Sequence, residues 1–116
     1  NLLTKNIEAY NEMRDNLFID PRLGLGPPTL SWLKALNDEL NKLAKMPPPE
    51  IPQLTFLGES DKVISKKAIE NRMARTPMGE LKILSGAMHE VFFETLDIKE
   101  KIWEEIDKFL NKNFPF

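Results

Sequence analysis

The sequence predicts an α/β fold in which two parallel strands are flanked by helices. Two short apolar runs, at about residues 53–58 and 80–85, have the length and composition of strands. A helical segment at about 65–75 separates them, and strand–helix–strand is the unit that places two strands parallel with a right-handed crossover. Further helical patterns occupy about 5–16, 29–46 and 96–112. Because two parallel strands alone make a poor sheet, the pattern is typical of the C-terminal portion of a larger α/β fold.

The first helix is expected within residues 1–16, with Thr4 as its N-cap. Apolar side chains follow at helical spacing (Ile7, Tyr10 and Met13). Residues 17–28 carry two glycines followed by two prolines, a composition that predicts a loop. This loop lacks the further glycine or lysine of a phosphate-binding loop, and no strand precedes it.

The second helix, 29–46, is capped in our prediction by Thr29 and ended by three prolines at 47–49. Its apolar stripe consists of leucines alone (Leu33, Leu36, Leu40 and Leu43). Such a stripe is typical of a coiled-coil seam or of a helix packed on a core. It covers few heptads, so we expect it to be buried against a sheet or a cap.

The crossover helix, 65–75, follows Ser65, which is expected to cap it. In the last helix, 96–112, Asp97 and Glu100 have the spacing of a capping box. Its predicted buried face repeats at helical spacing (Ile98, Ile102, Ile106, Phe109 and Leu110).

Composition excludes several classes of protein. The chain has 116 residues, which allows one domain at most, and 16 basic against 18 acidic side chains give a net charge of -2. This balance provides no basic footprint for nucleic acid, and no apolar run approaches the ~20 residues of a membrane span. Without cysteine there is no disulfide scaffold or zinc-thiolate site, and we predict no metal or cofactor. A cytoplasmic location is favoured.

Two side chains that could act in acid–base chemistry follow the predicted strands. Asp61 comes just after the first and His89, the single histidine, just after the second. Loops beyond the carboxyl ends of parallel strands meet at one edge of the sheet, so the two residues are expected to lie together. A carboxylate that accepts a hydrogen bond from one imidazole nitrogen fixes the tautomer and leaves the other nitrogen free to accept a proton. Glu59 is a rival acid, and a metal pair of Glu90 and Glu94 with His89 is a weaker interpretation.

These residues lie in segments that resemble a known family. The segments are NLLT near the start, PRLGLGPPTLSW at 21–32, IPQLTFLGESDKVIS at 51–65 and GELKILSGAMHEVFFE at 79–94. The chain resembles the C-terminal part of α/β-hydrolases of the lysophospholipase and monoacylglycerol lipase-like group, also called serine aminopeptidase-like. The resemblance places the triad acid at Asp61 and the triad base at His89. It also implies that 1–46 is the end of a cap region with return helices, and that 47–116 is the C-terminal βαβα part of the hydrolase core.

One element of the family pattern is absent from the sequence. The nucleophile of such enzymes lies in a G-x-S-x-G elbow, and no pair of glycines here brackets a serine at that spacing. The resemblance therefore implies the acid and histidine of a serine hydrolase of carboxylic esters, such as lysophospholipids or monoacylglycerols, without its nucleophile.

We expect this piece to be inactive alone. We also expect it to associate with the N-terminal portion of such a fold or, as a homodimer, with a second copy. The alternative is a non-catalytic α/β interaction module that keeps the pattern.

Overall fold

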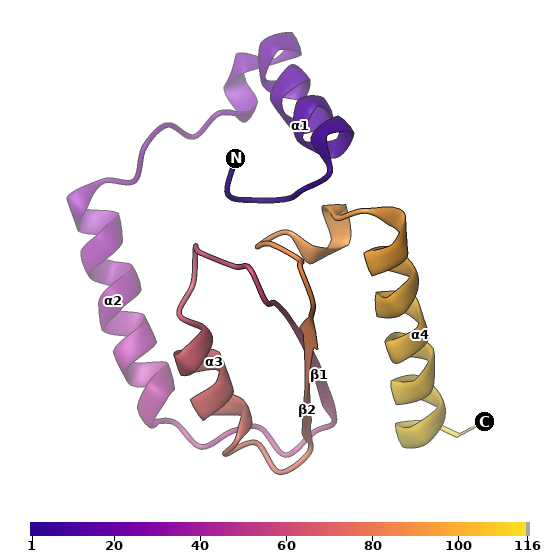
Figure 1. The fold of residues 1–116 in the computed structure, drawn as a ribbon. Helices are drawn as coiled ribbons and strands as arrows, with labels where there is room; N and C mark the ends of the chain where they lie inside the picture. Colours follow the sequence, from indigo (N-terminus) through magenta and orange to yellow (C-terminus); the bar gives the residue numbers. More distant parts are fainter. Residues whose placement is uncertain (116) are drawn as a thin grey trace.

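A computed structural model describes residues 1–115 of the chain. Residues 1–115 form four α-helices, two strands and two short 3-10 turns (Figure 1). In chain order these are α1 (Ile7–Ile19), η1 (Pro21–Leu23), α2 (Leu30–Lys45), β1 (Gln53–Gly58), α3 (Lys66–Met73), β2 (Gly79–Leu84), η2 (Val91–Phe93) and α4 (Leu96–Asn113).

The two strands are parallel, as the strand–helix–strand pattern predicts. They pair in register from Gln53 opposite Gly79 to Gly58 opposite Leu84. Helix α3 makes the crossover on one face of the sheet and α4 covers the other face (Figure 1). Both strands end at the same edge, so the loops that follow them lie next to each other. The α/β class predicted from the sequence is confirmed.

A small apolar core lies between the sheet and α4. Its buried members come from the end of β2, the loop that follows it and the first two turns of α4 (Leu84, Ala87, Val91, Ile98 and Ile102). Two ion pairs fasten α4 to β2: Lys82 Nζ lies 2.7 Å from Glu105, and Lys112 Nζ lies 2.8 Å from Glu80.

The predicted buried face of α4 is correct at Ile98 and Ile102 and wrong at Leu110, which is 45% exposed. The two-stranded sheet covers only part of the length of this helix. The predicted cap is also wrong. Thr95 occupies the N-cap position, and Asp97 lies in the first turn, where its carboxylate accepts a hydrogen bond from the Thr95 hydroxyl at 2.5 Å.

The N-terminal region differs from the prediction in two ways. Asn6, rather than Thr4, caps α1, accepting from the Ala9 N–H at 3.2 Å. Thr4 is instead buried, and its hydroxyl donates to the carbonyl of Phe93 at 2.9 Å. The helix continues to Ile19 through residues expected to be loop, because the first residue that interrupts it is Pro21.

Helix α2 is capped by Thr29, which accepts from the Trp32 N–H at 3.1 Å, as predicted. The predicted burial of its leucine stripe is wrong: the four leucines are between 41% and 54% exposed. This helix lies beyond α3, away from the sheet, and its end is held by Arg72 and Arg75 of the α3 region, which donate to carbonyls at its C-terminus (Figure 1).

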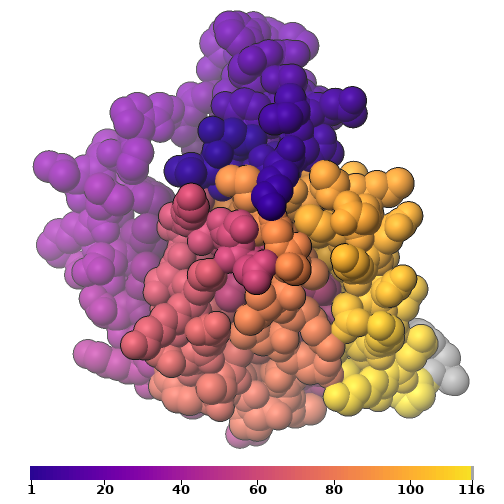
Figure 2. All heavy atoms as spheres, in the orientation of Figure 1, coloured from indigo at the N-terminus to yellow at the C-terminus, as the bar shows by residue number. Residues whose placement is uncertain are grey.

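The space-filling view shows the same separation (Figure 2). Side chains of the sheet, α3 and α4 form one continuous body, and α2 lies along its side. Among residues 1–115, no helix has both the length and the apolar character needed to cross a membrane.

Candidate active site

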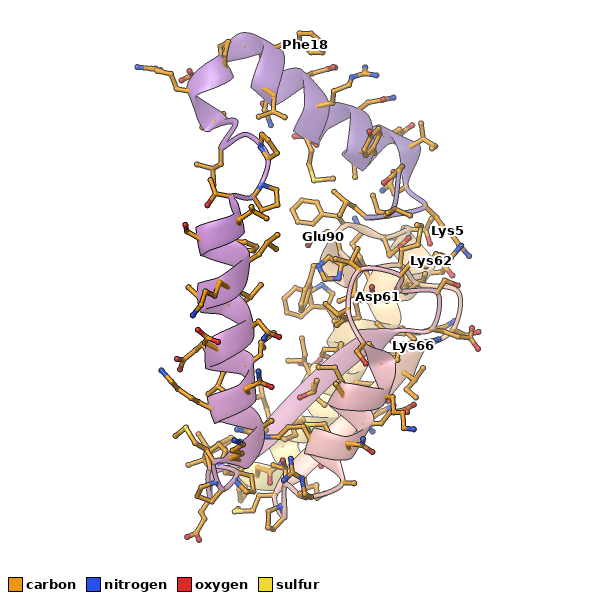
Figure 3. The ribbon with its side chains drawn as sticks, turned by 90° about the vertical axis from the view of Figure 1, so that its left-hand side faces the viewer. Lys5, Phe18, Asp61, Lys62, Lys66 and Glu90 are labelled. Carbon is orange, nitrogen blue, oxygen red and sulfur yellow. The ribbon has the colours of Figure 1, made fainter. Side chains whose placement is uncertain are left out.

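Asp61 and His89 meet at the carboxyl edge of the sheet. The two residues are 28 positions apart, and Nδ1 of His89 lies 2.9 Å from Oδ2 of Asp61. Asp61 is 6% exposed, whereas the imidazole keeps 28% of its surface accessible. Figure 3 shows Asp61 in the loop after β1, on the side of the sheet where Glu90 also lies. The proximity expected from parallel strand ends is present.

The other carboxylate oxygen of Asp61 is held by its own loop. Oδ1 accepts the N–H of Val63 at 2.7 Å and that of Ile64 at 3.3 Å. Burial raises the pKa of Asp61, but the hydrogen bonds from His89 and from these two amides outweigh it and hold the pKa below its usual value. The group is therefore a carboxylate at neutral pH, which favours the proton of the imidazole on Nδ1 and leaves Nε2 as the acceptor.

The backbones of the two loops are packed together at Gly58. A Cβ built on Gly58 would lie 2.0 Å from the carbonyl oxygen of Met88 and 2.7 Å from that of Ala87. The Ser60 N–H donates to the Ala87 carbonyl at 2.8 Å beside this contact. Only glycine allows the loop with Asp61 to approach the loop with His89 so closely. The sequence shows this glycine only as the end of a strand, so its role was not predicted.

Glu59, the rival acid, has other partners. Its Oε2 accepts the Ser85 hydroxyl and the Gly86 N–H, each at 2.9 Å. The bond from the Gly86 amide, then that from Ser85, lowers the pKa of Glu59. Gly86 has a φ of 75°, in the region that favours glycine. Glu59 thus joins the two loops through Ser85 and Gly86, and the geometry pairs Asp61 with His89.

The N-terminal segment, residues 1–6, crosses the loop that carries His89 (Figure 1). The Glu90 N–H donates to the Leu3 carbonyl at 2.8 Å. Glu94 is completely buried and accepts hydrogen bonds from the backbone N–H groups of Met88 and Lys5.

From the sequence, Glu94 was considered only as a weak candidate for a metal ligand, together with Glu90 and His89. Within residues 1–115, no group of three or more His, Cys, Asp or Glu side chains could hold a metal ion.

Two hollows of the described residues lie away from this pair. One, of about 550 Å³, is open along β1 and is lined by Phe56, Phe92 and Ile106 among others. The other, of about 940 Å³, lies between α2 and α3 and is also lined by the three prolines that follow α2. Neither is lined by Asp61 or His89.

Comparison with known proteins identifies the family. Residues 1–96 match the family described as serine aminopeptidase S33. The chain belongs to this family. The match confirms the resemblance to the lysophospholipase and monoacylglycerol lipase-like α/β-hydrolases that the sequence segments indicate.

Two members illustrate the relationship. The chain is 30% identical over 93 residues to a probable lysophospholipase L2 of Haemophilus influenzae, covering 79% of this chain and 30% of that hydrolase. It is also similar to the crystal structure of a soluble variant of monoglyceride lipase from Saccharomyces cerevisiae in complex with a substrate analogue. That match has 26% identity and a TM-score of 0.50, and it covers 53% of this chain and 22% of the lipase chain. The chain thus spans less than a third of the length of either hydrolase.

Proposed function

We propose that this chain supplies the acid and base of a serine hydrolase that cleaves carboxylic esters such as lysophospholipids or monoacylglycerols. The observation that carries the proposal is the 2.9 Å contact between Asp61 and His89 at the carboxyl edge of the sheet. The names of the relatives, a lysophospholipase and a monoglyceride lipase, support the substrate class.

In the proposed reaction, Nε2 of His89 takes the proton of a serine hydroxyl while the serine oxygen bonds to the ester carbonyl carbon. His89 then gives that proton to the leaving alcohol oxygen as the ester bond breaks. A water molecule attacks the acyl-enzyme in the same way, and its proton passes through Nε2 to the serine. Asp61 holds the imidazole in the required tautomer and stabilises its cation.

The nucleophile of this proposal lies outside the 116 residues, since none of the serines stands in a G-x-S-x-G elbow. We assign 1–46 to the end of a cap region with its return helices and 47–116 to the C-terminal βαβα part of the hydrolase core. The piece alone is then expected to be inactive, because it lacks both the nucleophile and the oxyanion hole.

The open side of β1 supports association. Within residues 1–115, β1 pairs with β2 alone, and it contributes to an open, largely apolar hollow that η2 and α4 also line. An unpaired strand edge readily accepts another strand. We infer that this edge is completed by the nucleophile-bearing portion of the fold or by a second copy of the chain.

The test compares the isolated 116-residue chain with the gene product that contains it. Both are treated with a fluorophosphonate probe and assayed on a monoacylglycerol and a lysophospholipid. We expect labelling and hydrolysis in the gene product only, with losses of several orders of magnitude in Asp61→Asn and His89→Ala. Glu104→Gln, which alters an exposed carboxylate of α4, is the matched control and should keep most activity. Hydrolysis by the isolated chain would contradict the external nucleophile, and unchanged rates in both variants would remove the pair from the mechanism.

A non-catalytic interaction module is the second candidate. The observation that favours it is the exposed leucine stripe of α2, which leaves an apolar face accessible. The same assay separates the two candidates. If the chain is an interaction module, the gene product has no hydrolytic activity. Replacing Leu36 and Leu40 by serine would then abolish binding to its partner.

A further inference from the structure

Glu94 is a completely buried carboxylate that the proposed acid–base pair does not use. A carboxylate without water is tolerated only where hydrogen bonds replace its hydration. Here both oxygens are occupied: Oε1 accepts the Met88 N–H at 2.8 Å, and the Lys5 N–H is shared between Oε2 at 3.1 Å and Oε1 at 3.3 Å. The carboxylate thus accepts two backbone donors that lie far apart in the sequence.

These contacts hold the backbone on both sides of His89. Met88, the residue before it, is bound by Glu94, while Glu90, the residue after it, donates to the Leu3 carbonyl at 2.8 Å. Leu3 belongs to the same N-terminal segment that Glu94 fixes through Lys5. The position of the histidine backbone therefore depends on Glu94 twice, directly through Met88 and indirectly through the segment 1–6.

Two further contacts complete the arrangement. The buried Thr4 hydroxyl donates to the carbonyl of Phe93, the neighbour of Glu94, at 2.9 Å. On the opposite side, Gly58 lies against the carbonyl oxygens of Met88 and Ala87. The residues around His89 are enclosed between the segment 1–6 and the end of β1. A change at Glu94 would therefore displace the backbone that carries the imidazole.

We propose that Glu94 is a positioning residue for His89, fixing the histidine loop and the N-terminal segment so that Nδ1 stays on Asp61. The proposal rests on the proposed function for the role of His89 as a base. Glu94 itself forms hydrogen bonds to backbone amides, and its effect passes through the backbone of Met88. A glutamine cannot replace it fully, since its single amide oxygen leaves an NH₂ group facing one of the two N–H donors.

His89 is the single histidine of the chain, which gives a direct readout. Long-range ¹H–¹⁵N NMR of the 116-residue chain, at a pH where the imidazole is neutral, reports which ring nitrogen carries the proton. We expect the Nδ1–H tautomer in the wild-type chain and its loss in Glu94→Gln. Asp61→Asn is the positive control, and Glu104→Gln, which changes an exposed glutamate of α4, should leave the tautomer unchanged. Circular dichroism checks that each variant is folded.

An unchanged tautomer in folded Glu94→Gln would overturn the proposal. If that variant does not fold, amide exchange of the wild-type chain decides. We expect the Met88 and Lys5 amides to exchange at least about tenfold more slowly than exposed loop amides, and rates equal to those of exposed loops would overturn the proposal. Because the tautomer reports geometry rather than turnover, its loss in Glu94→Gln stands even if the Asp61 and His89 variants of the gene product keep full activity. That combination would contradict the proposed function alone.

Discussion

The substitution Gly58→Ala tests how the loops that carry Asp61 and His89 are held together. The added Cβ would lie 2.0 Å from the Met88 carbonyl oxygen, whereas ordinary contacts begin at 3.4 Å. The histidine loop must therefore move by about 1.4 Å, since the obstacle is backbone rather than a flexible side-chain end. A shift of that size would extend the 2.9 Å contact between Asp61 and His89 beyond hydrogen-bonding distance.

The expected effects follow from this displacement. A misplacement of about 1 Å at a reacting group can lower the rate about a hundredfold, so kcat of the gene product should fall by roughly that factor. Overpacking at a rigid contact should lower the free energy of unfolding by about 1–3 kcal/mol. Ester hydrolysis and thermal unfolding measure the two effects.

Gly24→Ala is the matched control for this experiment. Its Cβ would meet the Pro21 carbonyl oxygen at 3.4 Å, an ordinary contact, and its φ of -84° suits any residue. We expect near-normal rate and stability from this variant. If Gly58→Ala behaves like Gly24→Ala in both assays, the close approach of the two loops does not fix the pair, and our interpretation of Gly58 is wrong.

Three further predictions concern pH and helix capping. The pKa of Asp61 is lowered, so the ionised side chain stabilises the fold at pH values above its unfolded-state pKa of about 4, and this stabilisation is lost as the pH falls through the folded-state pKa. In Asp61→Asn, the free energy of unfolding measured by denaturant titration should therefore depend less on pH in the acid range. The bonds from Lys108 and then Lys82 lower the pKa of Glu105 to about 2, so Glu105→Gln should be less stable than wild type at pH 7 and nearly equal to it at pH 2, by the same measurement. Thr29→Ala removes the cap of α2 and should cost about 1 kcal/mol of helix stability, visible as reduced protection of the amides of its first turn in hydrogen exchange.

Local patterns were sufficient to predict the strands, the crossover and the caps at Thr29 and Ser65, because short-range spacing determines these features. The proximity of Asp61 and His89 was also predictable. Parallel strands end at one edge, so topology alone brings residues after neighbouring strands together.

Burial was harder to predict where it depends on other elements. The leucine stripe of α2 has the periodicity of a buried face but is half exposed, because periodicity defines a face without defining what covers it. Thr4 was assigned to a cap since its type suits that position, yet its hydroxyl bonds to Phe93, 89 residues away. Likewise, Gly58 and Glu94 act through contacts with the histidine loop that no short-range pattern contains.

The central claim is that Asp61 and His89 act as one unit, and a double-mutant cycle on ester hydrolysis by the gene product tests it most directly. Rates are compared for Asp61→Asn, His89→Ala and the double variant. Residues of one catalytic unit are strongly non-additive, so we expect the double variant to be no slower than His89→Ala alone. Independent losses that multiply in the double variant, or a single variant with the wild-type rate, would contradict the account.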